Sequence, residues 1–112
     1  FESRISKMKI RTNRSAMREV ISNLVSNAVK YADEGSVIKI VCEKGKFSIW
    51  NAGEEISAQE IPVLFDPFYR RDNEVEGNGM GLYFVKNTLT RLGLRYRFSA
   101  YKGGMKFEIW FK

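Results

Sequence analysis

The stretch Asn23-Leu24-Val25-Ser26-Asn27-Ala28-Val29-Lys30-Tyr31 decides the fold that this sequence predicts, because it belongs to a long amphipathic helix. We expect the helix to run from about Arg14 to Ala32, with Asn13 or Ser15 as its N-cap and Gly35 as its stop signal. Apolar residues recur at helical spacing along one side and predict the face that packs on a core. These residues are Met17, Val20, Ile21, Leu24, Ala28 and Ala32.

A polar edge runs beside this apolar stripe. Asn23, Asn27 and Lys30 are spaced by four and three residues, so they stack on one face of the helix, and Tyr31 falls between that face and the core. One interpretation is an ordinary solvated helix side. The other is a ligand site, since an amide oxygen is a hard ligand suited to Mg²⁺ and a lysine supplies a mobile charge for phosphate.

Two hairpins are predicted after the helix. Residues 37–43 and 46–51 are rich in β-branched and aromatic residues, and Lys44-Gly45 between them is typical of a tight turn. Near the end of the chain, apolar residues alternate along two further strands, and Gly103-Gly104 is predicted to form their turn. The apolar residues of this second hairpin are Tyr96, Phe98, Ala100, Met105, Phe107, Ile109 and Phe111.

Shorter elements complete the predicted order. Residues 5–10 are compatible with a short strand, a short helix is expected near Ala58 to Val63, and a longer one from Leu82 to Leu92. This order predicts an α+β fold, a two-layer sandwich in which helices pack on one face of a mixed, mostly antiparallel sheet. With 112 residues and no repeat or interdomain linker, we expect a single domain over residues 1–112.

Composition narrows the class of protein. No apolar run approaches the roughly 18 residues of a spanning helix, and the first residues have no signal-peptide pattern. A single cysteine, Cys42, excludes an internal disulfide, and without any histidine we expect no structural zinc site. We expect Cys42 to be a buried packing residue, consistent with a reducing compartment.

The net charge of +6 is compatible with a polyanion partner or with a small ligand that carries phosphate. Lysines and arginines are spread along the chain without a basic run or an aromatic-interleaved patch. A nucleic-acid surface usually has one of these features, so we expect no nucleic-acid partner.

The stretch Gly77-Asn78-Gly79-Met80-Gly81-Leu82 places three glycines at alternate positions directly before a helical pattern. Glycines have no Cβ to keep a ligand from the backbone N–H groups, and these groups would lie at the positive end of a helix dipole. Such a pattern is typical of a phosphate-holding backbone and also of a flexible loop.

The sequence resembles the ATP-binding domain of sensor histidine kinases, which belongs to the ATPase superfamily shared with DNA gyrase, the Hsp90 chaperones and MutL. Residues 23–31 look like the N box of that family, and residues 51–56 resemble its first glycine box. Residues 65–70 resemble its F box, and residues 77–82 its second glycine box. The four boxes occur in the family's order and the resemblance covers nearly the whole chain.

The resemblance implies a left-handed βαβ sandwich of the Bergerat type that holds ATP and Mg²⁺ between the N-box helix and a lid. Asn27 would coordinate Mg²⁺, and Lys30 would approach the phosphates. In ATP-hydrolysing members the position of Asn23 is commonly a glutamate that acts as general base, and an amide cannot accept that proton. This difference favours phosphoryl transfer to a protein nucleophile, in which positioning and electrostatics do most of the work.

The resemblance also implies which residues contact the nucleotide. Tyr31 would pack near the adenosine, Phe65 and Phe68 would pack in a hydrophobic joint, and Arg70 would contact the γ-phosphate or close the lid. The catalytic set is Asn23, Asn27, Lys30 and Arg70. The nucleotide-contacting set is Asn27, Lys30, Tyr31, Asn51, Gly53, Ile56, Arg70, Arg71, Gly77, Gly79, Met80, Gly81, Leu82 and Met105.

Three positions depart from the family pattern, and all lie at the end of the site that would bind adenine. Asn51 stands where an aspartate usually accepts the adenine amino group, Glu55 replaces the second glycine of its box, and Met105 replaces a frequent threonine. A neutral amide accepts a hydrogen bond more weakly than a carboxylate. The alternative to an active kinase domain is therefore a degenerate, weakly nucleotide-binding scaffold domain of the same fold.

The kinases of this family phosphorylate a histidine, and this chain has none. We therefore expect the acceptor to lie on a separate dimerisation domain of a longer protein, with residues 1–7 as the remnant of the connection. The implied parent is a homodimeric two-component sensor that passes its phosphoryl group to a response regulator. The domain itself would be cytoplasmic, without membrane contact, whether or not the parent is anchored in a membrane.

Overall fold

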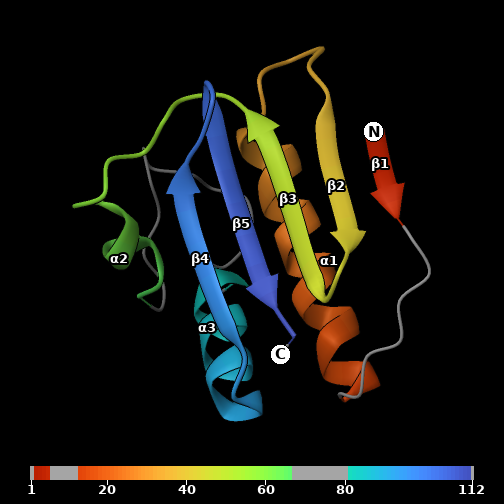
Figure 1. The fold of residues 1–112 in the computed structure, drawn as a ribbon. Helices are drawn as coiled ribbons and strands as arrows, with labels where there is room; N and C mark the ends of the chain where they lie inside the picture. Colours follow the sequence, from red (N-terminus) through yellow and green to blue (C-terminus); the bar gives the residue numbers. More distant parts are fainter. Residues whose placement is uncertain (1, 6–12, 67–80, 112) are drawn as a thin grey trace.

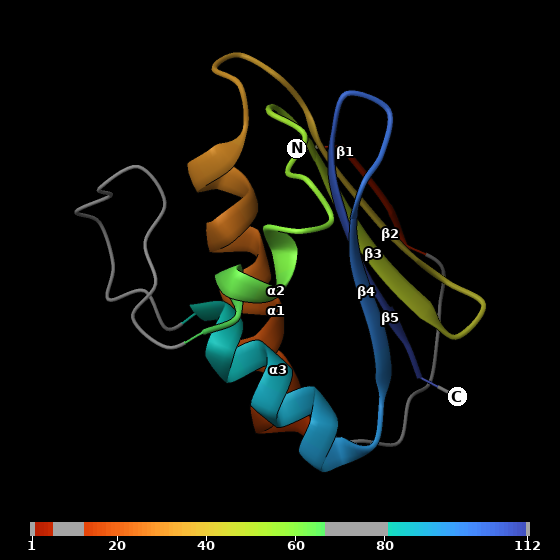
Figure 2. The ribbon, with the colours of Figure 1, turned by 90° about the vertical axis from the view of Figure 1, so that its left-hand side faces the viewer.

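Within residues 2–5, 13–66 and 81–111, which the computed structural model describes, five strands form one sheet and three helices cover one face of it (Figures 1 and 2). This two-layer α+β arrangement confirms the predicted fold class. The elements are β1 (Glu2–Ile5), α1 (Arg14–Tyr31), β2 (Ile38–Glu43), β3 (Lys46–Ala52), α2 (Ile61–Leu64), α3 (Gly81–Leu92), β4 (Arg95–Ala100) and β5 (Gly104–Trp110).

The strands follow the order β1-β2-β3-β5-β4. Only the β1–β2 pair among these strands is parallel, and the other three pairs are antiparallel. In Figure 1, β1 and β2 point downward, α1 lies behind the sheet, and β2 lies to the left of β1, so the crossover through α1 is left-handed. Nearly all parallel crossovers are right-handed, so this unusual hand agrees with the βαβ unit that the family resemblance implies.

Strand β1 overlaps the strand predicted over residues 5–10 at Ile5. It pairs Glu2 with Lys39 and Ile5 with Cys42, whereas residues 6–12 lie outside the described part of the chain. The rest of the strand predicted over residues 5–10 therefore stays a prediction. That residues 1–7 continue a connection to another domain stays a prediction.

Helix α1 begins and ends close to the predicted residues. Asn13, and not Ser15, is the N-cap, since its Oδ1 accepts a hydrogen bond from the Ala16 N–H at 2.9 Å. The last turn closes where the Ala32 N–H donates to the Ala28 carbonyl at 2.9 Å. Residues of the predicted stripe enter the main core together with residues from α3, β3 and β5. This core includes Met17, Val20, Leu24, Ala28, Ile49, Val85, Leu89, Phe107 and Ile109.

Both hairpins turn over two residues with positive φ, which matches the right-handed twist of the strands. The first turn is Lys44-Gly45 (φ 55° and 72°), as predicted. The second is Lys102-Gly103 (φ 47° and 77°), one residue earlier than predicted. Gly104 is instead the first residue of β5, where glycine is required because a Cβ would overlap the Asn51 carbonyl oxygen.

The aromatic segment after β3 packs as expected up to the last described residue. Helix α2 begins at Ile61, later than the expected Ala58, because residues 58–60 form a turn in which the Glu60 N–H donates to Ser57 Oγ at 3.2 Å. Phe65 is 8% exposed and lies 6.4 Å from Phe107, ring centre to ring centre, so its role as a packing residue is confirmed. Phe68 lies outside the described residues.

Cys42 is half-buried on β2 and packs against the core, so it is less buried than predicted. Burial raises the pKa of its thiol, which keeps it protonated and unreactive at neutral pH. Among the residues described, no helix has the length and apolar character that crossing a membrane requires.

A carboxylate is buried on the outer face of the sheet, the face without helices. Glu108 is 2% exposed, and its oxygens bind Lys46 Nζ at 2.8 Å, Arg97 Nη2 at 2.9 Å and Lys106 Nζ at 3.8 Å. Burial by itself raises the pKa of Glu108, but hydrogen bonds from Lys46 and Arg97 and the charges of Lys46 and Lys106 outweigh it. The net pKa therefore lies below the ordinary value for glutamate.

Replacing Glu108 with glutamine is expected to lower the free energy of unfolding by about 1 to 2 kcal/mol at pH 7, since the cationic partners are partly exposed and screened by solvent. A depressed carboxyl pKa stabilises the fold above the unfolded-state pKa. The difference between wild type and Glu108→Gln should therefore shrink as the pH falls below about 4.3. Urea unfolding at pH 7 and pH 3 measures this difference in unfolding free energy, and Glu34→Gln, at an exposed position, is the control. An equal deficit at both pH values would contradict the ion-pair explanation.

Candidate functional site

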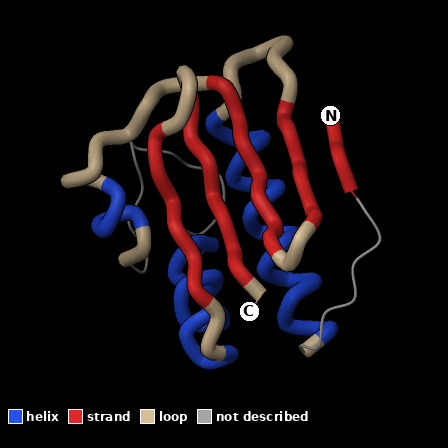
Figure 3. Tube along the Cα trace, in the orientation of Figure 1, coloured by secondary structure: helices blue, strands red, loops and turns tan. Residues whose placement is uncertain are grey.

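Three segments far apart in the sequence meet at one end of the molecule, the top in Figures 1 and 3. They are the C-terminal ends of α1 and β3 and the turn between β4 and β5. Backbone hydrogen bonds join them, because the Asp33 N–H donates to the Ala52 carbonyl at 2.9 Å and the Gly53 N–H donates to the Gly103 carbonyl at 3.0 Å. The end of β3, where the first glycine box begins, is thereby held between the N-box helix and the last hairpin.

Gly53 lies close to the C-terminal end of α1. A Cβ at Gly53 would lie 2.6 Å from the Tyr31 carbonyl oxygen and 3.4 Å from Asn51 Nδ2. No side chain larger than hydrogen fits at the first distance without moving backbone. The predicted need for glycine at this position is thus explained by the fold, before any ligand is considered.

Asn51 lies at the centre of the group and is 5% exposed. Its Nδ2 donates to the Ala52 carbonyl at 3.2 Å, and it pairs across the sheet with Met105. No residue in the described part of the chain donates to Asn51 Oδ1. This oxygen is therefore the atom through which Asn51 can accept a hydrogen bond from a ligand.

Met105 and Glu55, which both depart from the family pattern, form contacts within the protein. The Ile56 N–H donates to the Met105 sulfur at 3.2 Å, and Ile56, Leu64 and Met105 form a small buried apolar cluster. The Gly103 N–H donates to Glu55 Oε2 at 2.8 Å. Together with the Gly53–Gly103 bond, the Glu55 carboxylate fixes the glycine-box loop to the last hairpin.

The polar edge of α1 faces the start of α3. Asn23 Nδ2 donates to the Glu19 carbonyl at 2.8 Å, and Asn23 Oδ1 would lie 3.2 Å from a Cβ placed at Gly81. Asn27 is half-buried one turn further along α1. The Lys30 ammonium lies 5.5 Å from the centre of the Tyr31 ring.

These contacts bring together two groups of predicted site residues. Asn51, Gly53, Ile56 and Met105 gather at the end of the sheet, and Tyr31 joins them to the α1 edge. Leu82 packs beside both apolar clusters from the first turn of α3. The remaining predicted residues, Arg70, Arg71, Gly77, Gly79 and Met80, lie outside the described part of the chain.

Sequence reasoning missed the role of Glu55, which it interpreted only as a lost glycine. The partner of Glu55 is 48 residues further along the chain. No local pattern signals such a contact, because it depends on the pairing of β3 with β5.

Comparisons with known proteins identify the family. Residues 12–112 match the family described as histidine kinase-, DNA gyrase B- and HSP90-like ATPase. Sensor histidine protein kinase HK06 of Streptococcus pneumoniae is 39% identical over 97 residues, which are 84% of this chain and 22% of that protein. Phosphate regulon sensor protein PhoR of Haemophilus influenzae is 41% identical over 85 residues, which are 69% of this chain and 20% of that protein.

Solved structures have the same fold. The catalytic domain of histidine kinase ThkA matches with a TM-score of 0.81 and 25% identity, over 96% of this chain and 73% of that one. The mycobacterial sensor histidine kinase MprB also matches with a TM-score of 0.81, at 23% identity, over 96% of this chain and 77% of that one. The chain therefore belongs to the histidine kinase-, DNA gyrase B- and HSP90-like ATPase family, as an ATP-binding domain of the histidine kinase type. It spans about a fifth of the length of the curated relatives named here.

Replacing Gly53 with alanine should force the glycine-box loop away from α1, because the new Cβ would lie 2.6 Å from the Tyr31 carbonyl oxygen. We expect a loss of about 1 to 3 kcal/mol in unfolding free energy and a weaker affinity for ATP. Gly93→Ala is the matched control, since Gly93 also has positive φ (73°) but nothing within 4 Å of its Cβ position. Denaturant unfolding and ATP titration of both variants test this. Equal ATP affinity in the two variants would show that the Gly53–Tyr31 contact does not shape the site.

Proposed function

We propose that this domain binds ATP with Mg²⁺ where α1, β3 and the β4–β5 turn meet, and donates the γ-phosphoryl group to a histidine on a separate dimerisation domain. The observation that carries the proposal is the contact between Gly53 and the Tyr31 carbonyl. It joins the group formed by Asn51, Ile56 and Met105 to the helix that bears Asn27 and Lys30.

The adenine would bind at the sheet end of the site. Asn51 Oδ1 would accept a hydrogen bond from the adenine amino group. Gly53, whose missing Cβ lets its backbone lie close to the Tyr31 carbonyl, would hold the loop beside the base. Ile56 and Met105 would supply apolar contact with the ring. The Ile56–Met105 and Glu55–Gly103 bonds support this, since they hold the residues that would surround the base.

The phosphates would extend along the polar edge of α1. Asn27 offers an amide oxygen, a hard donor of the kind that suits Mg²⁺, and bound Mg²⁺ would neutralise charge on the phosphate oxygens. Lys30 would move from the Tyr31 ring to contact the phosphates. Arg70, Arg71 and the backbone of Gly77, Gly79 and Gly81 would complete the lid end.

Asn23 favours transfer over hydrolysis. Its amide cannot take a proton from water, and its Nδ2 already donates within α1. In the proposed reaction a histidine nitrogen forms a bond to the γ-phosphorus as the bond to the β–γ bridging oxygen breaks, and ADP leaves. The full-length protein would be a homodimeric sensor that passes the phosphoryl group to a response regulator.

The second candidate is a scaffold domain of the same fold with little nucleotide affinity. It is favoured by the neutral Asn51 and by the internal contacts that already occupy Glu55 and Met105. The two candidates differ in nucleotide binding, which can be measured directly.

Calorimetric titration with ATP and Mg²⁺ should give a measurable affinity below millimolar concentration. Asn51→Ala should weaken binding and reduce the preference for ATP over GTP. Asn51→Asp should strengthen it by about three- to tenfold, because a carboxylate accepts the adenine hydrogen bond more strongly. Asn87→Asp, the same change on the exposed side of α3, should leave affinity unchanged. No binding at millimolar nucleotide would support the scaffold candidate.

Phosphoryl transfer can be tested separately with γ-labelled ATP and a dimerisation hairpin from a related kinase that carries the acceptor histidine. Label should appear on the hairpin and not on this chain, which contains no histidine. Asn27→Asp should reduce transfer at least tenfold by altering the metal ligand, with the exposed Lys86→Gln as control. Nucleotide binding without transfer to any hairpin would refute the kinase activity while leaving ATP binding intact.

A further inference from the structure

The outer face of the sheet carries cations and aromatic rings in an ordered pattern. The strand register aligns Lys46, Trp110 and Arg95 in one row across β3, β5 and β4. Another row aligns Lys39, Trp50 and Lys106 across β2, β3 and β5. In each row a tryptophan lies between two cations. A middle row consists of Val41, Ser48, Glu108 and Arg97.

The cations lie over the rings of this face. Lys46 Nζ is 5.3 Å from the Trp110 ring centre, and the guanidinium carbons of Arg95 and Arg97 are 5.5 and 5.7 Å from it. Lys106 Nζ is 4.0 Å from the Tyr101 ring centre. The sequence has no aromatic-interleaved basic run, but the fold brings cations and aromatic rings together on this face. Alternation along three strands brings these residues to one face, although they are far apart in the sequence.

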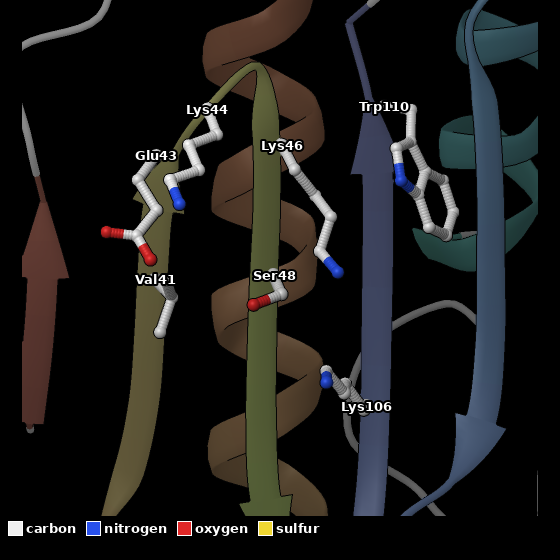
Figure 4. Close-up of a pocket in the computed structure, with 7 residues that line it drawn as sticks. All are labelled: Val41, Glu43, Lys44, Lys46, Ser48, Lys106 and Trp110. Carbon is white, nitrogen blue, oxygen red and sulfur yellow. The ribbon is translucent and has the colours of Figure 1, made fainter.

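A hollow of about 390 Å³ lies on this face (Figure 4). It is present because Val41 and Ser48, in the middle row, are smaller than the side chains of the rows beside them. In Figure 4 the Lys46 and Lys106 ammonium groups lie between β3 and β5, Lys44 hangs between β2 and β3, and the Glu43 carboxylate is directed toward β1. The lining residues are Val41, Glu43, Lys44, Lys46, Ser48, Lys106 and Trp110.

We propose that the outer face of the sheet is a docking surface for an acidic protein segment, whose carboxylates enter the hollow between Lys44, Lys46 and Lys106. Charge complementarity supports this occupant. Cations outnumber carboxylates on the face, and Glu108 already shows that a carboxylate is bound there by Lys46, Arg97 and Lys106 together. A peptide carboxylate would repeat that interaction at the surface.

A protein segment fits this surface better than a nucleic acid does. Single-stranded nucleic acids bind by stacking bases on open aromatic faces, but cations of this chain lie over the Trp110, Trp50 and Tyr101 rings. Glu43 and Glu108 also place negative charge within the face, which would repel a continuous phosphate backbone more than separate carboxylates.

The docking surface and the candidate nucleotide site lie in different layers. Figure 2 shows the helices on one side of the sheet and this face on the other. The two sites share no residue, so a peptide should bind with or without ATP. Failure of the ATP titration would therefore leave this proposal untouched.

The chain supplies its own reporter, since its two tryptophans, Trp50 and Trp110, both lie on this face. An oligoglutamate peptide should change the tryptophan fluorescence saturably, with an affinity that falls as salt is raised from about 50 mM to about 500 mM. Oligoglutamine of equal length is the neutral probe and should not bind. Lys44→Asn with Lys106→Gln should weaken oligoglutamate binding about tenfold.

The control variant, Arg18→Gln with Lys86→Gln, also removes two positive charges, but from the helical layer. It should leave the affinity for oligoglutamate unchanged. Val41→Phe fills the hollow without changing charge and should weaken binding about threefold or more. Thermal unfolding of each variant verifies that it is folded. The proposal is overturned if oligoglutamate does not bind, if both charge variants weaken binding equally, or if single-stranded DNA of equal charge binds more tightly than the peptide.

Discussion

The packing of α1 against the sheet is the constraint on which the rest of the structure depends. Val20, Leu24 and Ala28 are almost completely buried, and burial of side chains of this kind supplies most of the favourable free energy of folding. Because a helix is rigid, burying this stripe also fixes the direction of the polar residues beside it. The direction of the Asn27 side chain is therefore set by the burial of Leu24 and Ala28, and a change in core packing would also change the geometry of the site.

A second constraint is the close approach of backbone segments at the top of the sheet. Gly53 lies against the Tyr31 carbonyl, and Gly104 lies against the Asn51 carbonyl. Each glycine permits a contact that any side chain would prevent, and the exposed Glu55–Gly103 bond adds about 1 kcal/mol or less to such an arrangement. The residues that depart from the family pattern thus hold the site together, so that departure from the pattern does not by itself indicate loss of function.

The two faces of the sheet differ because successive side chains of a strand point to opposite sides. On β5, Met105, Phe107 and Ile109 face the helices, whereas Lys106, Glu108 and Trp110 lie on the outer face of the sheet. Glu108 is buried although it lies on the outer face, since the surrounding cations cover it. One strand therefore contributes both to the apolar core beneath the proposed nucleotide site and to the proposed docking surface.

The sequence by itself determined the features that arise from neighbouring residues: the approximate span of α1, the Lys44-Gly45 turn and the order of the family boxes. For the cap of α1 it left two candidates, Asn13 and Ser15, and the structure selected Asn13. Only the tertiary structure decided the position of β1, the Lys102-Gly103 turn, the contact of Glu55 with Gly103 and the rows of cations around Trp50 and Trp110. Helical periodicity and turn residues act within a few positions of the chain, so a short stretch of sequence is enough to predict them. Strand register joins residues that are up to 64 positions apart, such as Lys46 and Trp110, and it is set by burial of the whole sheet against the helices.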